Sequence, residues 1–499
     1  MKFIDRTNIT ILILIVVMLA LVLYPAFAYS IPITQTDGAT HYIYAKTYSD
    51  TGDLNALNPA YNTLGSCETR ISDYPPLTTI IFSSLISIFG NDVFFINGGL
   101  AAIFFLIASI FVFLFFKDVT NNKKIALLGL LFFVLNLRAY YTLTTGIFPS
   151  FISFCLTIPS LYFAYRFFTN KGNTYWNFIF MIVLNFLTTL TYTVQGAYLI
   201  FIEFAMWIGI IIDEKVDIKL PQINYKIKRI DFSDFNKIIY FLLPVVILFI
   251  VVFSMFTITE SSSVRSDWLS NWASDLMGSC TGYPCAWNFF LITDGPVFIL
   301  MAFLGSIYLF FKKQWKILSL VLASLIILLS GSFFINGTEN VMLYLYRFYT
   351  TFFVFLSIPT SILIYKILSN KQVRNVGVII LVLILMIQVG KLGFFYSQMT
   401  PAITMDEYYA SQELLGYSDS RILYVNNDIE SGNFRAFKWI VVYARSENYD
   451  VENILPNEIT GYDYVFVKNK NILTEIEQKT LESLDITFTG EEVAIYSRT

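Results

Sequence analysis

The chain has 499 residues, of which 56% are hydrophobic and only 14% charged, and its mean hydropathy is +0.63. Soluble globular proteins carry about 25% charged residues, so most of this chain has too few charges to cover a water-facing surface. The net charge of −3 and the pI of about 5.4 argue against a nucleic-acid-binding protein.

The first apolar segment follows a short basic start, Lys2 and Arg6, and runs from Ile9 to Tyr29. About 20 apolar residues are enough to span a bilayer. A cleaved signal peptide is the alternative, but the segment is long for one and has no clear small-residue cleavage site. We therefore expect a retained first transmembrane helix.

The next segment, 30–76, carries a polar motif that reads Thr36-Asp37-Gly38-Ala39-Thr40-His41. If it is helical, Asp37 and His41 share one face, because they are four residues apart. A carboxylate there can take a proton from an acceptor hydroxyl, and an Asp–His pair can bind a phosphate or a metal, or adjust the pKa of the base. The alternative is that Asp37 caps an interfacial helix and that His41, the only histidine, is a solvated loop residue.

This segment ends in Asp73-Tyr74-Pro75-Pro76-Leu77, and an apolar stretch continues to Phe89. Proline is tolerated in the first turn of a helix, so the motif predicts a helix start. The stretch is too short to cross a bilayer, and we expect an interfacial or re-entrant helix. Asp73 is either a second acid in the site or a turn residue.

Further apolar runs bring the number of predicted spans to eleven. They lie near 9–29, 93–116, 125–141, 147–167, 175–193, 196–212, 238–258, 296–311, 317–335, 344–366 and 376–396. With a cytoplasmic N-terminus, 19 of the 33 Lys and Arg residues fall in inner segments and 5 in outer loops. This bias predicts that segments 30–76, 259–295 and 397–499 are extracytoplasmic.

Three charged residues near or within the spans need partners, since charge in hydrocarbon is costly. Arg138, at the outer end of the third span, and Arg347, at the outer start of the tenth, either bind a group such as a phosphate or extend to the interface. Glu203, inside the sixth span, either pairs within the bundle or is protonated, and we interpret it as structural.

The segment 397–499 is polar and predicts a small soluble α/β domain that follows a transmembrane domain at 1–396. Strand-like runs occur at Arg421–Val425, Tyr464–Val467 and Val493–Tyr496, and helical patterns at 404–415, 430–445 and 474–484. In the loop 259–295, Cys280 and Cys285 are either free thiols or a disulfide.

Taken together, the early external Asp37, the Asp73–Leu77 motif, the eleven spans and the external C-terminal domain resemble the GT-C superfamily. These are integral-membrane glycosyltransferases that use polyprenyl-phosphate sugars. The likeness is closest to the prokaryotic mannosyltransferase and aminoarabinose-transferase type. Segments 36–41 and 145–150 also resemble an uncharacterised group of related prokaryotic membrane proteins. The resemblance implies an all-α polytopic membrane fold with a small extracytoplasmic α/β domain.

The resemblance also implies an inverting sugar transfer, with Asp37 as the general base, His41 assisting it and the lipid phosphate as leaving group. Four residues are expected to bind the substrate: Asp73, Tyr74, Arg138 and Arg347. The oligosaccharyltransferase branch carries further acidic metal ligands in its next external loop, but here 138–149 contains no acid. We therefore expect the metal-independent branch that transfers monosaccharides, with no cofactor.

The expected partners are a polyprenyl- or dolichyl-phosphate sugar donor, membrane lipid, and a glycan, lipid or protein acceptor outside the membrane. A transporter or flippase of a lipid-linked glycan is one alternative, and it would often show internal repeats, which we do not find. A non-catalytic membrane assembly protein is another, and it would need neither Asp37 nor the arginines. The sequence therefore favours a glycosyltransferase of the cell envelope.

Overall fold

The computed structural model describes most of the apolar helices and much of the C-terminal domain. The described residues are 6–33, 36–56, 76–90, 92–144, 146, 148–219, 224–227, 294–334, 341–397, 399, 401–417, 420–426, 439–441, 443–444, 448–452, 455–456 and 459–498. The chain divides into two compact units. The first comprises Met1–Leu21, Ala102–Thr142 and Pro149–Gln398, and the second Val22–Ala101, Leu143–Phe148 and Met399–Thr499.

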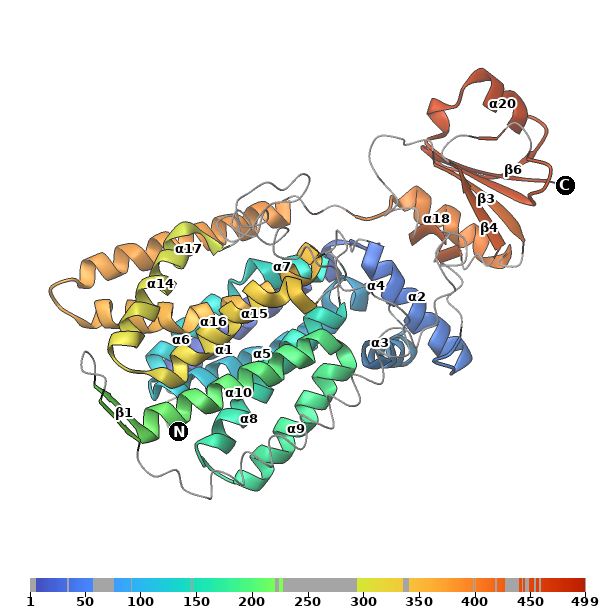
Figure 1. Cartoon of the computed structure of the whole chain (residues 1–499). Coiled ribbons are helices and arrows are strands. Elements are labelled where there is room, and N and C mark those ends of the chain that lie inside the picture. The colour runs from blue at the N-terminus through green and yellow to red at the C-terminus, as the bar shows by residue number, and fades with distance from the viewer. Residues whose placement is uncertain are drawn as a thin grey trace, which may run out of the picture. The chain divides into compact units, whose positions relative to one another are not determined.

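Seven described helices are long and apolar enough to cross a membrane (Figure 1). They are α1 (Arg6–Ala28), α5 (Leu100–Thr120) with the π-helical turn η3 (Phe95–Gly99) before it, α8 (Phe148–Phe168), α9 (Thr174–Thr191), α10 (Thr193–Lys215), α16 (Val341–Ser369) and α17 (Arg374–Ser397). Helices α3 (Pro76–Phe89) and α14 (Pro296–Phe311) are apolar but shorter, and in α15 (Trp315–Phe334) the apolar segment with described side chains is Trp315–Ile327. The predicted span at 238–258 lies outside the described residues. The polytopic helical class is confirmed.

Helix α8 is the most buried of these spans, with 89% of its apolar window inside the protein, against 17% for α1 and for α17. Ser150, Ser153, Thr157 and Ser160 recur every three or four residues, so they lie on one face of α8, and all are buried. Small side chains of this kind let membrane helices approach closely, and their hydroxyls can hydrogen-bond across the interface. The core of the first unit therefore contains buried polar groups as well as apolar ones.

The predicted third span, 125–141, is wrong as one helix. The structure has α6 (Lys123–Val134) followed by the short α7 (Leu137–Thr144). The break lies at Asn136, whose side-chain Oδ1 accepts the backbone N–H of Arg138 at 3.2 Å. A side-chain acceptor two residues before a helical N–H is an N-cap, so Asn136 starts a new helix instead of continuing the old one.

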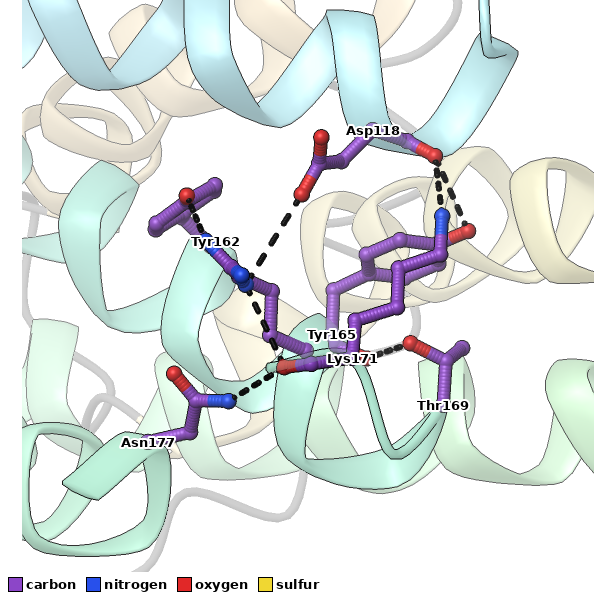
Figure 2. Close-up of polar contacts among 7 residues, drawn as sticks. Asp118, Tyr162, Tyr165, Thr169, Lys171 and Asn177 are labelled. Carbon is purple, nitrogen blue, oxygen red and sulfur yellow. Dashed lines mark hydrogen bonds and ion pairs between the residues drawn. The ribbon is translucent and has the colours of Figure 1, made fainter. Parts of the chain in front are cut away.

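Polar side chains tie the turn between α8 and α9 to the last turn of α5 (Figure 2). Lys171 Nζ donates to the carbonyl oxygen of Asp118 at 2.9 Å, and Arg166 Nε lies 3.9 Å from Asp118 Oδ2. Arg166 Nη1 contacts the hydroxyl of Tyr162 at 2.5 Å, and Asn177 Nδ2 donates to the carbonyl of Lys171 at 2.7 Å. Cations at a helix C-terminus satisfy its unpaired carbonyls, so this cluster anchors helix ends.

Two short helices of the second unit follow α1. They are α2 (Thr36–Thr51) and α3, which begins at Pro76 as the sequence predicted. The stretch between α1 and α2 is held by Asn97 of η3, whose Oδ1 accepts the N–H of Ile33 at 3.0 Å and whose Nδ2 donates to Ile31 O at 2.9 Å. The next residue, Gly98, lies so close to α1 that a Cβ there would come within 2.3 Å of Val22 O. Only glycine fits at that position.

The described part of the C-terminal domain contains a five-stranded mixed sheet and helices, which confirms the predicted α/β class. Its strand order is β4 (Asn448–Glu452), β3 (Arg421–Asn426), β5 (Tyr464–Lys468), β7 (Val493–Ser497) and β6 (Asp485–Thr489). Strand β3 is parallel to β4 and β5, whereas β7 is antiparallel to β5 and β6. Leu423, Val425 and Val467 pack in one buried cluster with Leu481 of α20 (Glu475–Leu481).

Two helices of this domain, α18 (Met405–Leu414) and α20, each begin with a capping box. In α18 the Thr404 hydroxyl accepts the N–H of Glu407, and the Glu407 carboxylate accepts the N–H of Thr404. Thr474 and Glu477 repeat the arrangement at the start of α20. Burial alone would raise the pKa of the Glu477 carboxyl, but hydrogen bonds from Thr474 and from the backbone N–H of Leu455 lower it below its ordinary value.

The C-terminal domain and the segment after α1 are joined within the second unit. Ala402 donates its N–H to Pro32 O at 2.7 Å, and the Tyr29 hydroxyl donates to Met399 O at 3.0 Å. The Tyr42 ring of α2 lies 5.8 Å from the Trp439 ring and 5.6 Å from the Tyr443 ring, centroid to centroid. The segments that follow α1 and α17 therefore contact each other.

Candidate functional site

The first polar centre lies on α2, where the sequence placed its acid–histidine motif. The segment is helical, so Asp37 and His41 are four residues apart on one helix and share its face. The side chain of Asp37 lies outside the described part of the chain, and so do Asp73 and Tyr74 altogether. The structure therefore leaves the roles of these three residues as predictions.

His41 is buried, with 5% of its surface exposed, so the alternative of a solvated loop histidine is wrong. Its ring meets that of Phe148 edge to face at a centroid distance of 6.2 Å, and that of Tyr44 at 6.5 Å. Phe148 belongs to the 145–150 segment, and the neighbouring Gly146 has a φ of +79°. The fold thus brings together two segments far apart in sequence, 36–41 and 145–150, that carried the sequence resemblance.

The second polar centre lies in the first unit and is built around Arg138. The guanidinium Nη2 lies 2.5 Å from Asp294 Oδ2, and the two side chains are 2% and 1% exposed. The expectation that Arg138 extends to the interface is therefore wrong, and its partner is a carboxylate of the chain. Asp294 lies two residues before Pro296, the first residue of α14.

Helix α17 completes this centre from the far end of the sequence. Gln388 Nε2 donates to the backbone carbonyl of Asp294 at 2.6 Å. The charge of Lys391 interacts with those of Asp294 and Arg138, and a Cβ built on Gly295 would lie 3.5 Å from Lys391 Nζ. Asp294 therefore faces two cations, which a buried carboxylate needs in order to stay ionised.

Two buried polar atoms beside this centre have no hydrogen-bond partner among the described residues: Gln388 Oε1 and Asn136 Nδ2. Each belongs to an amide whose other end is bonded at the centre, Gln388 to Asp294 and Asn136 to Arg138. An unpaired buried amide group costs about 1–3 kcal/mol, so a bound polar molecule that paired with it would be favoured. The cations and the spare donor Asn136 Nδ2 suit a phosphate ester, whose oxygens accept hydrogen bonds, whereas Gln388 Oε1 is itself an acceptor and needs a donor such as a hydroxyl.

Arg347, the other predicted phosphate ligand, lies in α16, but its side chain is outside the described residues. Cys280 and Cys285 also fall outside them. Glu203 is fully buried in α10 and bonded to Ser160 and Asn185. Among the described residues, no group of three or more His, Cys, Asp or Glu side chains could hold a metal ion.

Sequence reasoning missed Asp294, Gln388 and Lys391. A signal for Lys391 was available, because it stands alone in the apolar run 376–396, where a charge needs a partner. A signal for Asp294 was weaker, since an acid before Gly-Pro is common in turns.

Comparisons with known proteins extend these observations. No protein-family profile matches the chain, and neither does any curated protein sequence. Among solved structures, one that matches is the oligosaccharyltransferase AglB from Archaeoglobus fulgidus, in complex with an inhibitory peptide and a dolichol-phosphate. The superposition covers 99% of this chain and 74% of the AglB chain, with a TM-score of 0.58 and 10% sequence identity. ArnT from Cupriavidus metallidurans in the apo state matches 97% of both chains, with a TM-score of 0.56 and 10% identity. The same ArnT bound to undecaprenyl phosphate matches with a TM-score of 0.51 and 9% identity.

AglB and ArnT are both GT-C membrane glycosyltransferases. The match covers nearly the whole of this chain in each case, including the helical part and the C-terminal domain. The fold of this chain is therefore the GT-C fold, as the sequence resemblance predicted.

Proposed function

We propose that this protein transfers a sugar from a polyprenyl-phosphate donor to an acceptor outside the cytoplasm. The observation that carries the proposal is the buried Arg138–Asp294–Lys391 centre in a GT-C fold, because it offers fixed cations to a phosphate at the end of a membrane helix bundle. The solved structures with this fold include one with dolichol-phosphate and one with undecaprenyl phosphate, which supports a lipid phosphate as the ligand here.

In the proposed reaction, an acceptor hydroxyl attacks the anomeric carbon of the sugar. The new carbon–oxygen bond forms as the bond from that carbon to the phosphate oxygen breaks, and the electron pair leaves with the lipid phosphate. Asp37 takes the hydroxyl proton, and attack from the side opposite the leaving group inverts the anomeric centre. His41, one helical turn further along α2, is proposed to orient Asp37 or to contact the phosphate.

Arg138 and Lys391 are proposed to bind the departing phosphate, together with Arg347. Asp294 is proposed as a positioning residue, since it fixes the guanidinium of Arg138 before the substrate arrives. Fixed donors stabilise developing charge better than mobile ones, because they do not have to reorganise during the reaction. Asp73 and Tyr74 keep their predicted place in substrate binding.

We also propose that the N-terminus is cytoplasmic and that the C-terminal domain is extracytoplasmic, where it could bind the acceptor. The shared contacts of Ala402 with Pro32 and of Tyr42 with Trp439 support placing the domain on the same side as α2. The excess of Lys and Arg in the predicted inner segments then sets the direction. Protease treatment of intact cells should remove a C-terminal epitope tag but spare an N-terminal one.

The test of the function is sugar transfer by the full chain in vesicles that contain a labelled polyprenyl-phosphate sugar and membrane extract as acceptor source. Asp37→Asn should abolish transfer. Asp53→Asn, in the same loop but with a carboxylate that accepts only the N–H of Asn55 among the described contacts, should leave it unchanged. Full transfer by Asp37→Asn would refute the general base. Lipid movement across the vesicle without any transfer, unaffected by Asp37→Asn, would identify a flippase instead.

A further inference from the structure

A polar cluster that the proposed reaction does not use lies between α8, α9 and α10. Ser160 Oγ is 2.5 Å from Asn185 Oδ1 and 2.8 Å from Glu203 Oε1. Asn185 Nδ2 is 2.7 Å from Glu203 Oε2, which closes a ring of three contacts. Ser160 and Glu203 are fully buried, and all three helices are candidate membrane spans.

The ring has too few protons if Glu203 is ionised. A serine hydroxyl carries one proton, and a carboxylate carries none. With the amide as placed, the Ser160 proton can serve either the contact with Asn185 Oδ1 or the contact with Glu203 Oε1. The other contact would then join two oxygen atoms with no proton between them, at a distance where they repel.

Exchanging the amide oxygen and nitrogen of Asn185 does not remove the shortage. The amide nitrogen would then donate to Ser160, and Ser160 would donate to Glu203 Oε1. The amide oxygen would now face Glu203 Oε2 at 2.7 Å, again with no proton between them. The positions of the amide nitrogen and oxygen do not by themselves show which atom is which. Because both orientations of the amide leave one contact without a proton, both need one more proton on the carboxyl group.

We propose that Glu203 is a membrane-embedded proton-binding site that carries a proton at neutral pH and completes a closed ring of three hydrogen bonds. Solvent supplies the proton to the carboxylate, and no other bond changes. None of the ion pairs among the described residues includes Glu203, so no described cation offsets its charge. An isolated carboxylate in hydrocarbon is costly, whereas a neutral acid with every donor and acceptor paired is not.

The proposal predicts an order among substitutions. Glu203→Gln keeps one donor and one acceptor in the same positions, so the ring persists and the thermal unfolding midpoint of the full chain should match that of the wild type. Glu203→Ala removes the partner of Asn185 Nδ2 and one contact of Ser160, and should lower the midpoint clearly. A Gln variant as unstable as the Ala variant would contradict a neutral acid, because an ionised carboxylate is the species that Gln cannot replace.

The direct test is infrared spectroscopy of the purified full chain at neutral pH. A carbonyl band of a protonated carboxylic acid should be present in the wild type and absent from Glu203→Gln. It should be unchanged in Glu407→Gln, because the similarly buried Glu407 forms an ion pair with Lys468 Nζ at 2.7 Å. Ser160→Ala keeps the acid but removes a hydrogen bond from it, so the band should move to higher frequency. A wild-type spectrum without an acid band would overturn the proposal, whatever the variants do.

Discussion

The carboxylate of Asp294 should matter more to stability than either cation that it faces. Its Oδ2 lies 2.5 Å from Arg138 Nη2, both side chains are almost fully buried, and the charge of Lys391 also interacts with it. Removing one partner of a buried ion pair costs about 3–5 kcal/mol, because the remaining charge is left without compensation. Asp294→Asn removes the anion from both cations at once, so we expect a loss at the upper end of that range.

Arg138→Gln should cost less, because Lys391 still faces the Asp294 carboxylate. A paired apolar replacement, Arg138→Met with Asp294→Leu, should recover part of the stability lost in Asp294→Asn, because it removes one of the two cations that the lost carboxylate compensated, while Lys391 still lacks its anion. The free energy of unfolding can be followed for the full chain in mixed micelles as denaturing detergent increases, with Asp53→Asn as the exposed control. If Arg138→Gln proved more destabilising than Asp294→Asn, the argument that one carboxylate serves two cations would be refuted.

The same variants separate stability from function. The apolar double variant should be more stable than Asp294→Asn yet fail to transfer sugar, because Arg138, one of the proposed phosphate-binding cations, is gone. Sugar transfer is measured with the labelled polyprenyl-phosphate donor. Substantial activity in this variant would exclude Arg138 from the reaction and leave it a purely structural residue.

Three smaller predictions concern the second unit. Because hydrogen bonds lower the pKa of the Glu477 carboxyl, its stabilising effect is complete above the ordinary glutamate pKa and disappears as pH falls through the lowered value. Hydrogen exchange in β5 should therefore rise on acidification in the wild type and less so in Glu477→Gln. Glu475→Gln is the control. Gly98→Ala should cost about 1–3 kcal/mol, because its Cβ would overlap the backbone of Val22, which cannot rotate away. Thr404→Ala removes the α18 cap and should cost about 1 kcal/mol, seen as faster exchange in the first turn of that helix.

The sequence was sufficient for the features that depend on local patterning. Long apolar runs have few ways to satisfy their backbone in a bilayer other than as helices, so α1, α8, α9, α10, α16 and α17 appear close to their predicted positions. The predicted strands at 421–425, 464–467 and 493–496 are apolar and central, and they correspond to β3, β5 and β7. Strands β4 and β6 were missed because they lie at the two edges of the sheet, and β6 is largely exposed and lacks a continuous apolar pattern.

Features set by distant partners could not be predicted from local patterns. Asn136 stands within an apolar run, and a single asparagine does not usually end a membrane helix. The helix that begins after this break carries Arg138, whose partner Asp294 is 156 residues further along the chain. His41 is buried because Phe148, from a segment far along the sequence, covers it. In each case the residue type was noticed from the sequence, but the environment came from the tertiary fold.

The first unit neutralises two buried acids in different ways, and the difference indicates which of them takes part in chemistry. Glu203 meets only neutral groups, and the number of available protons requires it to be a neutral acid; such a group offers nothing to an anionic substrate. Asp294 meets two cations, the guanidinium of Arg138 at 2.5 Å and the charge of Lys391. Buried ion pairs add little stability beyond what apolar residues would give, so their presence is better explained by a need for fixed charge. An anionic lipid phosphate that binds inside a membrane protein requires such fixed positive charge. This reasoning supports the proposal that Arg138 and Lys391 bind the substrate and that Glu203 holds helices together.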